Sequence, residues 1–220
     1  MLTECNGIVL RQTKALKGRR MILLFTDRLG KVSCGTSISE RGRSSSALAV
    51  RPFTVGRYTL RRERGYTNIS GAETIKSYYS YGENYDKYVN ASLVLEFAGK
   101  LLPEEAPAPE LYAATLSFMD MMERRKSAHR TLTAAWLVGA LGFAGVLPDA
   151  QNFGSDDLLS ALEFDTLEAL AYMMGNHIER MAALALDESI ASTLIRTLLR
   201  FAERHLDITN LRSEPVFSEH

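Results

Sequence analysis

The hydrophobic periodicity of the chain changes at about residue 80, and this change constrains the fold more than any other feature. Before it, apolar runs are short and are separated by glycines and polar residues, which is typical of β-strands. After it, Val89, Leu93 and Phe97 recur every four residues, as on one face of an α-helix. The sequence therefore predicts an α+β protein with a β-domain over residues 1–80 and an all-α domain over residues 81–220.

Five segments of the N-terminal domain have the length and composition of strands, namely residues 3–11, 21–27, 31–38, 47–62 and 66–79. Pro52 favours an edge position or a bulge for the fourth segment, because proline donates no ladder hydrogen bond. Gly71 interrupts the fifth. The stretch SERGRSSS before the fourth segment has no apolar face to bury, so we expect a mobile loop there. Five short, bent strands predict a small closed barrel of the OB type rather than a sandwich.

The C-terminal domain is expected to contain only helices. The first ends at Pro103, the second starts near Pro109, and the third lies in the uncharged stretch 131–148 and ends near Leu141. That stretch is too short and too rich in glycine to span a membrane, so we expect a buried helix containing Trp136. Ser155 is a candidate N-cap of a short connector. Further helices are predicted over residues 164–174, 175–186 and 187–206.

Charge divides the chain in the same place. Residues 1–80 contain 15 Lys/Arg and 5 Asp/Glu, a net charge of +10, and residues 81–220 contain 11 and 21, a net charge of −10. A dense positive field attracts a polyanion and favours release of its counterions. The N-terminal domain is therefore a candidate nucleic-acid-binding domain, with a solvated basic face as the simpler alternative.

The basic segment between Leu29 and Arg64 and its neighbours supply the candidate contacts. If the strands form a barrel, their loops and one face bring these cations together: Lys17, Arg19, Arg20, Lys31, Arg41, Arg43, Arg57, Arg61, Arg62 and Arg64. Aromatic side chains on which bases could stack are Phe53, Tyr58, Tyr66 and Tyr78.

Signals for catalysis are weak. The common phosphate-loop, serine-hydrolase, zinc-protease and dinucleotide-binding motifs do not occur, and the four histidines are scattered. Cys5 and Cys34 form no metal-ligand pattern, and Cys34 on a strand is expected to be a small buried side chain. No signal-peptide core precedes the first strand. We therefore expect a cytoplasmic, nucleoid-associated protein that is not an enzyme and needs no cofactor.

Short motifs along almost the whole chain resemble the RecO family of bacterial DNA repair proteins, which are recombination mediators. The matching residues are Asn6–Leu10, Leu24–Thr26, Leu29–Lys31, Gly35, Leu48, Pro52–Phe53, Glu96, Leu101–Glu104, Leu141–Phe143, His205–Leu206 and Leu211–Ser213.

The resemblance implies an OB-fold joined to a helical domain, with no catalytic turnover. It also implies binding of single- and double-stranded DNA, annealing of complementary strands, and work with RecR, and possibly RecF, to load recombinase. The helical domain would receive the acidic C-terminal tail of single-strand-binding protein, and Arg130 is our candidate contact. Many family members hold zinc with four cysteines, but the corresponding stretch AGVLPDAQNFGSDD has none, so we predict no zinc site. Lys17, Arg19 and Arg20 replace an acidic pair common in the family, which would strengthen DNA binding at low salt.

Three alternatives stay open. The chain could be an OB-fold RNA-binding or ribosome-associated factor, a protein-interaction adaptor whose basic face docks an acidic partner, or an undetected nuclease. A preference for structured RNA would identify an RNA-binding factor. Failure to bind nucleic acid at low ionic strength would identify an adaptor, and metal-dependent loss of DNA would identify a nuclease.

Overall fold

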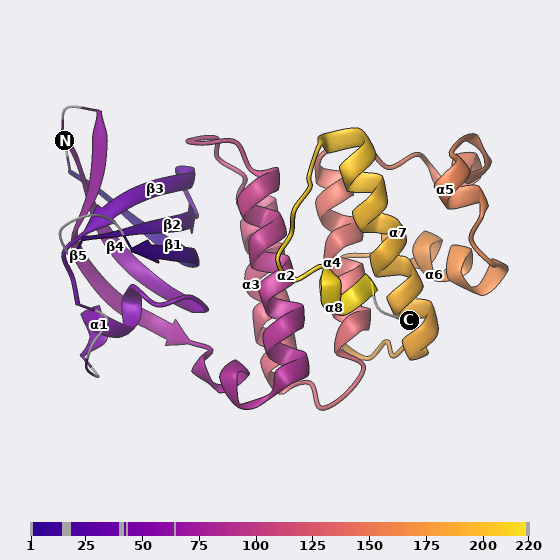
Figure 1. Ribbon diagram of the computed structural model, residues 1–220, viewed down its shortest axis with the longest axis horizontal. Coiled ribbons are helices and arrows are strands. Elements are labelled where there is room, and N and C mark those ends of the chain that lie inside the picture. Colours follow the sequence, from indigo (N-terminus) through magenta and orange to yellow (C-terminus); the bar gives the residue numbers. More distant parts are fainter. Residues whose placement is uncertain (1, 15–18, 40–41, 43, 64, 219–220) are drawn as a thin grey trace. The chain divides into compact units, whose positions relative to one another are not determined.

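The computed structural model describes residues 2–14, 19–39, 42, 44–63 and 65–218. The chain forms two compact units (Figure 1), which we call the barrel unit, residues 1–80 and 98–112, and the helical unit, residues 81–97 and 113–220. The segment 98–112 thus groups with the strands. The division predicted from the sequence, at residue 80, stays a prediction.

The barrel unit is built from five strands that close on themselves. They are β1 (Leu2–Lys14), β2 (Arg20–Thr26), β3 (Gly30–Thr36), β4 (Thr54–Glu63) and β5 (Tyr66–Ser77). Their order around the barrel is β1-β2-β3-β5-β4, with antiparallel pairs except at β3 and β5, where Gly35 pairs with Asn68 in parallel. This arrangement confirms the predicted fold class.

Register shifts bend the long β4–β5 pair. Thr59 lies opposite Gly71 and Leu60 opposite Ile69, so Ser70 is an extra residue in β5. Such a bulge sharpens the local twist and helps a sheet to close. The interruption predicted at Gly71 is therefore a bulge beside it, within one continuous strand.

The predicted strand 47–62 is wrong in its first part. Residues Ser45–Ala49 form a short helix, α1, and β4 begins only at Thr54. The Ser44 hydroxyl accepts a hydrogen bond from the Ala47 amide at 3.2 Å, which caps the helix. Ser44 therefore caps α1, and Ser45 and Ser46 are its first two residues, so the expectation of a mobile loop is wrong for these three serines.

Tyr58 belongs to the barrel core. Its side chain is fully buried, and its hydroxyl donates to the Ala49 carbonyl at 2.6 Å, which ties α1 to the interior. Cys5, Cys34 and Leu60 pack in the same cluster. The expectation that Cys34 is a buried apolar side chain is confirmed.

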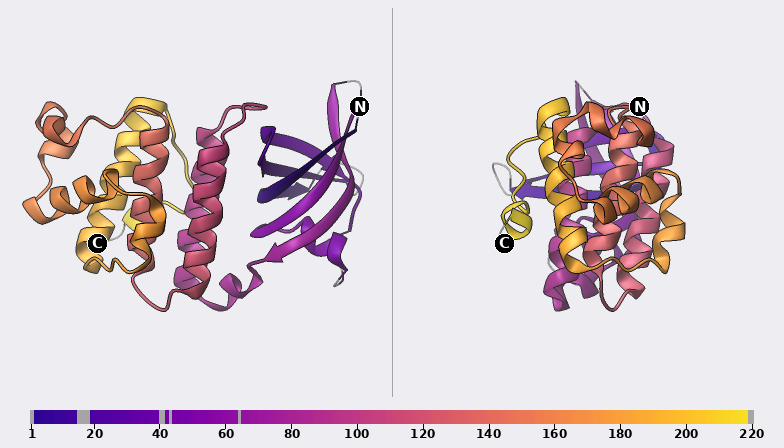
Figure 2. Two further views of the ribbon diagram at one scale, coloured as in Figure 1. Left: turned by 180° about the vertical axis from the view of Figure 1, so that it is seen from behind. Right: turned by 90° about the vertical axis from the view of Figure 1, so that its right-hand side faces the viewer.

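The helices are α2 (Tyr85–Leu101), α3 (Pro109–Arg124), α4 (His129–Phe143), α5 (Asp157–Ser160), α6 (Phe164–Met174), α7 (Glu188–Leu206) and α8 (Pro215–Ser218), with 3-10 turns at Tyr79–Glu83, Ala150–Ser155 and Ile178–Ala182. Within the helical unit, α4 and α7 lie side by side (Figures 1 and 2). No helix in the described part of the chain is long and apolar enough to cross a membrane.

Trp136 on α4 is buried, as predicted. Its indole N–H donates to the Thr115 hydroxyl at 3.2 Å, and its ring meets Phe97 edge-on with centroids 6.0 Å apart. The uncharged stretch thus forms a core helix, and the buried indole N–H of Trp136 has a hydrogen-bond partner.

Two helix predictions need correction. Asp156, and not Ser155, caps α5, because its carboxylate accepts from two backbone amides of the first turn. The predicted helix 175–186 is instead a 3-10 turn within an irregular segment. There the Arg125 guanidinium donates to the carbonyls of Met181 and Leu184, so a side chain from outside the segment satisfies carbonyls that an α-helix would bond internally.

Candidate nucleic-acid interface

An open groove of about 1660 Å³ runs over the outside of the barrel. Residues of β2, β3 and β5, the end of β4, and the segment between α2 and α3 line it. Strands 2 and 3 and the adjoining loops of OB-folds are the surface on which oligonucleotides are commonly bound. The groove therefore lies where the fold predicts a ligand site.

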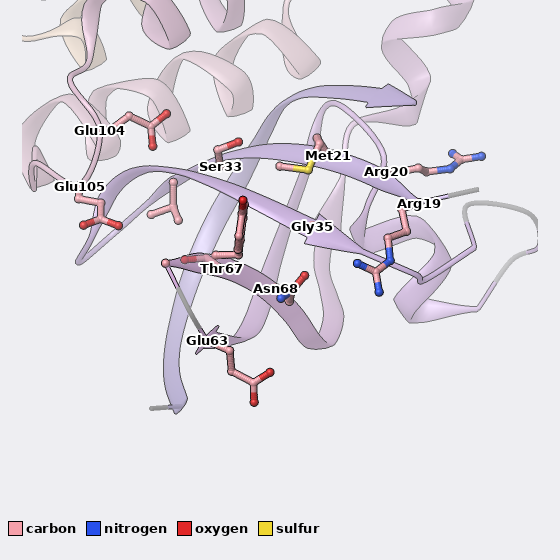
Figure 3. A pocket seen from close by; sticks show the side chains of 13 residues that line it. Arg19, Arg20, Met21, Ser33, Gly35, Glu63, Thr67, Asn68, Glu104 and Glu105 are labelled. Atoms are coloured by element: carbon pink, nitrogen blue, oxygen red, sulfur yellow. The ribbon is translucent and has the colours of Figure 1, made fainter. Parts of the chain in front are cut away.

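Strand alternation explains which side chains reach the groove. Met21 and Ser33 point outward, whereas Ile22 and Cys34 beside them are buried in the barrel. Figure 3 shows Met21, Ser33 and Thr67 along the groove. The floor of the groove thus combines apolar and hydroxyl groups.

The two ends of the groove differ in charge. Arg19, which is exposed, and Arg20, which is half-buried, lie at one end, and Glu104 and Glu105 lie at the other (Figure 3). Phosphate groups would therefore bind most favourably near the two arginines.

The structure brings only part of the predicted cation set to this groove. Arg57 and Arg61 are exposed on β4 and lie outside the described lining. Arg57 sits opposite Glu73 of β5, and the Arg61 Nε lies 2.8 Å from a Glu63 carboxylate oxygen.

Lys31 and Arg62 have partners within the barrel unit. The Lys31 ammonium donates to the Gly99 carbonyl at 3.0 Å, near the C-terminal end of α2. Arg62 pairs with Glu105 at 3.0 Å, and both side chains are about half exposed, 57% and 48%. The predicted residues Lys17, Arg41, Arg43 and Arg64 lie outside the described residues. Assignment of the whole set to DNA binding stays a prediction.

The prediction that aromatic side chains stack on bases is wrong for two of the four residues. Tyr58 and Tyr78 are buried, so their ring faces cannot meet a base. Phe53 is half-buried. Tyr66, in contrast, is 76% exposed and lines the groove.

Sequence reasoning missed the polar side chains on the floor of the groove and the acids at its far end. Thr67 and Asn68 line the groove, but in the sequence they belong to no binding motif and are recognisable only as residues of a predicted strand. Glu104 and Glu105 are an acidic pair in the sequence PEEAPAP, which lies between the helix expected to end at Pro103 and the helix expected to start near Pro109. Which strand a connection lies against depends on tertiary packing, so the pair could not be placed.

The two thiols of the barrel are poor nucleophiles. Burial is the main cause that raises the pKa of Cys5 to about 11 and that of Cys34 to about 12. At neutral pH both are protonated. Among the described residues, no group of three or more His, Cys, Asp or Glu side chains is placed to hold a metal ion.

Arg130, the candidate contact for an acidic tail, belongs to the helical unit. Its Nε lies 2.8 Å from a Glu188 carboxylate oxygen, its Nη1 donates to the Ser192 hydroxyl at 2.5 Å, and its guanidinium lies 5.4 Å from the Phe217 ring centroid. Arg130 thus joins α4, α7 and α8. Its role in binding a partner stays a prediction.

Comparisons with known proteins agree with the fold. Residues 1–78 match the family model described as Recombination protein O N terminal, and residues 82–155 match Recombination protein O C terminal. The chain is 19% identical to the DNA repair protein RecO of Alkaliphilus metalliredigens over 97% of both chains. It is 27% identical to that of a Nocardioides species over 73% of this chain and 67% of the relative. It is 25% identical to that of Listeria monocytogenes over 54% of this chain and 46% of the relative. The chain belongs to the RecO family of DNA repair and recombination proteins.

Proposed function

We propose that this protein is a recombination mediator that binds single- and double-stranded DNA through its barrel unit. It anneals complementary strands and helps to load recombinase onto DNA coated by single-strand-binding protein. We propose further that it has no catalytic turnover. Membership of a DNA repair family supports the general role, and the groove supports the proposal that the barrel holds the strand.

The groove is the single observation that carries the proposal. It has arginines at one end, and Tyr66 exposes its ring beside the floor. Single-strand-binding OB-folds combine cations for the backbone with aromatic rings for the bases, because every base has a face that can stack. A strand could therefore bind here without a strong sequence preference.

The groove also supports weak, salt-sensitive binding rather than tight specific recognition. Phosphate contacts carry most of the affinity of such a site, and salt competes with them. Two arginines at one end of a groove that also contains carboxylates give a modest positive field. We expect affinity to fall steeply between low and physiological ionic strength.

The proposed function also includes binding of protein partners. Single-strand-binding protein and RecR are proposed because the family consists of DNA repair proteins and mediators act on coated DNA. The acidic composition of residues 81–220 would slow the approach of an acidic tail at long range. A tail must therefore find a local cationic contact, for which Arg130 is the candidate.

The central test is oligonucleotide binding by fluorescence anisotropy across a salt series. Arg19→Ala and Arg20→Ala should each weaken binding several-fold and lower the salt slope by about 0.7 for each lost phosphate contact on a single strand. Arg200→Ala is the matched control, because Arg200 is exposed on α7 in the helical unit. Equal binding by all variants would remove the groove from the proposal.

The mediator role needs two further measurements. The protein should accelerate annealing of complementary oligonucleotides, and Arg20→Ala should slow this in proportion to its lost affinity. A labelled acidic tail peptide should bind the wild-type protein more tightly than Arg130→Ala. Preference for structured RNA over single-stranded DNA would instead support an RNA-binding factor.

A further inference from the structure

The connection between α2 and α3 lies directly against the barrel. We call its residues 103–106 the strap. Glu104 pairs with Lys31 of β3 as a parallel bridge, and the Glu105 amide donates to the Lys31 carbonyl at 2.8 Å. The strap therefore adds one short parallel pairing to β3.

Gly30 makes this close approach possible. It adopts φ +69°, and a Cβ built on it would lie 1.8 Å from the Ala106 carbonyl oxygen. A residue with a side chain at this position would clash with the backbone of Ala106, which could shift only at a cost in free energy. The Lys31 side chain adds a second link between β3 and the chain before the strap, because its ammonium donates a hydrogen bond to the Gly99 carbonyl near the end of α2.

The strap directs two carboxylates into the groove. Glu104 and Glu105 both line it, and Glu105 adopts φ 56°, a left-handed conformation that non-glycine residues rarely take. Its two carboxylate oxygens each lie 3.0 Å from Arg62 Nη1. A phosphate group would offer the same chemistry to this guanidinium, namely two oxygens that share a negative charge.

We propose that the strap competes with the DNA backbone for Arg62. In the free protein Glu105 holds the guanidinium, and the two strap carboxylates repel phosphates from their end of the groove. Arg62 lies beside the groove, in a small adjoining pocket that Thr67 and Glu105 also line. A strand that enters from the Arg19 and Arg20 end reaches this pocket when one of its phosphates replaces Glu105 on Arg62. The inference rests on the proposed binding of DNA in the groove.

The exposure of the ion pair makes the exchange feasible. Both side chains are about half exposed, and exposed pairs of this kind contribute little to stability. A phosphate can therefore displace Glu105 without a large cost, while the strap backbone stays bonded to Lys31. The strap weakens binding only moderately and does not block it.

A double-mutant cycle tests the competition with a labelled single-stranded oligonucleotide. Glu105→Gln should tighten binding by roughly two- to five-fold, the range expected from releasing an exposed pair. Arg62→Gln should weaken binding. In the Arg62→Gln background, the further change Glu105→Gln should have only the effect of removing one negative charge from the groove.

Glu104→Gln measures that charge effect separately. Glu104 is the neighbouring strap residue, it also lines the groove, and the described ion pair of Arg62 does not include it. Its effect should be the same in both Arg62 backgrounds. Far-UV circular dichroism and melting of each variant should match wild type, because all three positions are exposed.

The outcomes separate this inference from the proposed function. If the wild type binds DNA but Glu105→Gln has no more effect than Glu104→Gln in either background, the competition is overturned and DNA binding stands. If Arg62→Gln binds as well as wild type, Arg62 makes no phosphate contact and the competition is likewise overturned. If no variant, wild type included, binds DNA at low salt, the proposed function itself fails.

Discussion

The two units of this protein use polar side chains in different ways. In the described part of the barrel unit, the arginines of β4 are exposed, and Arg61 and Arg62 pair with the exposed carboxylates of Glu63 and Glu105. In the helical unit, polar groups hydrogen-bond inside the fold, as the buried Thr133 hydroxyl does with Asn90 at 2.6 Å. The arginines of β4 are therefore available to a ligand, whereas the Thr133 and Asn90 pair serves the fold of the helical unit.

The difference between exposed and buried polar pairs determines whether a substitution reports on ligand binding or on stability. Removing one member of an exposed pair changes stability by less than about 1 kcal/mol, so its effect on ligand binding can be read directly. Removing a buried partner leaves another polar group unsatisfied and costs about 1–3 kcal/mol. Ligand binding is therefore best tested by substitutions on the barrel surface. Stability is best tested by substitutions that remove a buried hydrogen-bond partner.

The chain contains convenient probes for each unit. Trp136, its single tryptophan, lies in the core of the helical unit, and both cysteines are buried in the barrel. Tryptophan fluorescence therefore follows the helical unit. Reaction of the cysteines with a thiol reagent follows opening of the barrel, because buried thiols react only from opened states.

The largest effect is expected from Glu96→Ala in the helical unit. The Glu96 carboxylate accepts from the Arg212 and Ser213 amides at 2.9 and 3.2 Å, and from the Ser213 hydroxyl at 3.3 Å, so it anchors the segment before α8. Loss of these charge-assisted bonds should cost about 2 kcal/mol of unfolding free energy, measured by tryptophan fluorescence in urea. Glu96→Gln, which keeps one acceptor oxygen, should lose less. Unchanged unfolding of both variants would contradict this anchor role.

A smaller effect is expected from Tyr58→Phe in the barrel. The change removes the hydroxyl that donates to the Ala49 carbonyl and leaves that oxygen without its buried donor. We expect a loss of about 1 kcal/mol, seen as faster cysteine labelling. Tyr66→Phe is the control, because Tyr66 is exposed and should not change labelling. DNA affinity lost in Tyr58→Phe at unchanged stability would restore Tyr58 as a contact.

The smallest effect is a pH dependence confined to the helical unit. Desolvation by burial lowers the pKa of His129 below its usual 6.5, with Asp86, Lys87 and Arg125 nearby. The unfolded chain then binds more protons than the folded one just below pH 6.5, so stability falls as the pH drops through that range. His129→Gln should flatten the difference in urea midpoint between pH 8 and pH 5.5. A wild-type midpoint that does not fall would contradict the shift.

Sequence reasoning placed the barrel well because each strand satisfies a local rule. The segments 21–27 and 31–38, which form β2 and β3, follow from composition and alternation. It failed at residues 47–53, where the apolar residues 47–49 end α1 and residues 50–53 form a turn before β4. There the cap from Ser44 and the bonds between Ser45 and Thr74 of β5 outweigh strand propensity.

The candidate site was predictable only in part. Arg19, Arg20 and Tyr66 were named from the sequence and do line the groove. Lys31 was named for its charge, but its ammonium binds the carbonyl of Gly99, which is 68 residues away in the sequence. Charge counts predict that a surface attracts a polyanion, and they do not indicate which cations already have a partner.

The sequence by itself determined the α+β class, the barrel and the division of charge, because these depend on local periodicity and composition. Only the tertiary structure decided that Tyr58 belongs to the core, that Glu96 holds the segment at Arg212 and Ser213, and that the strap lines the groove. Such contacts join residues far apart along the chain. They form only where packing brings the partners within hydrogen-bonding distance, and no local pattern encodes that distance.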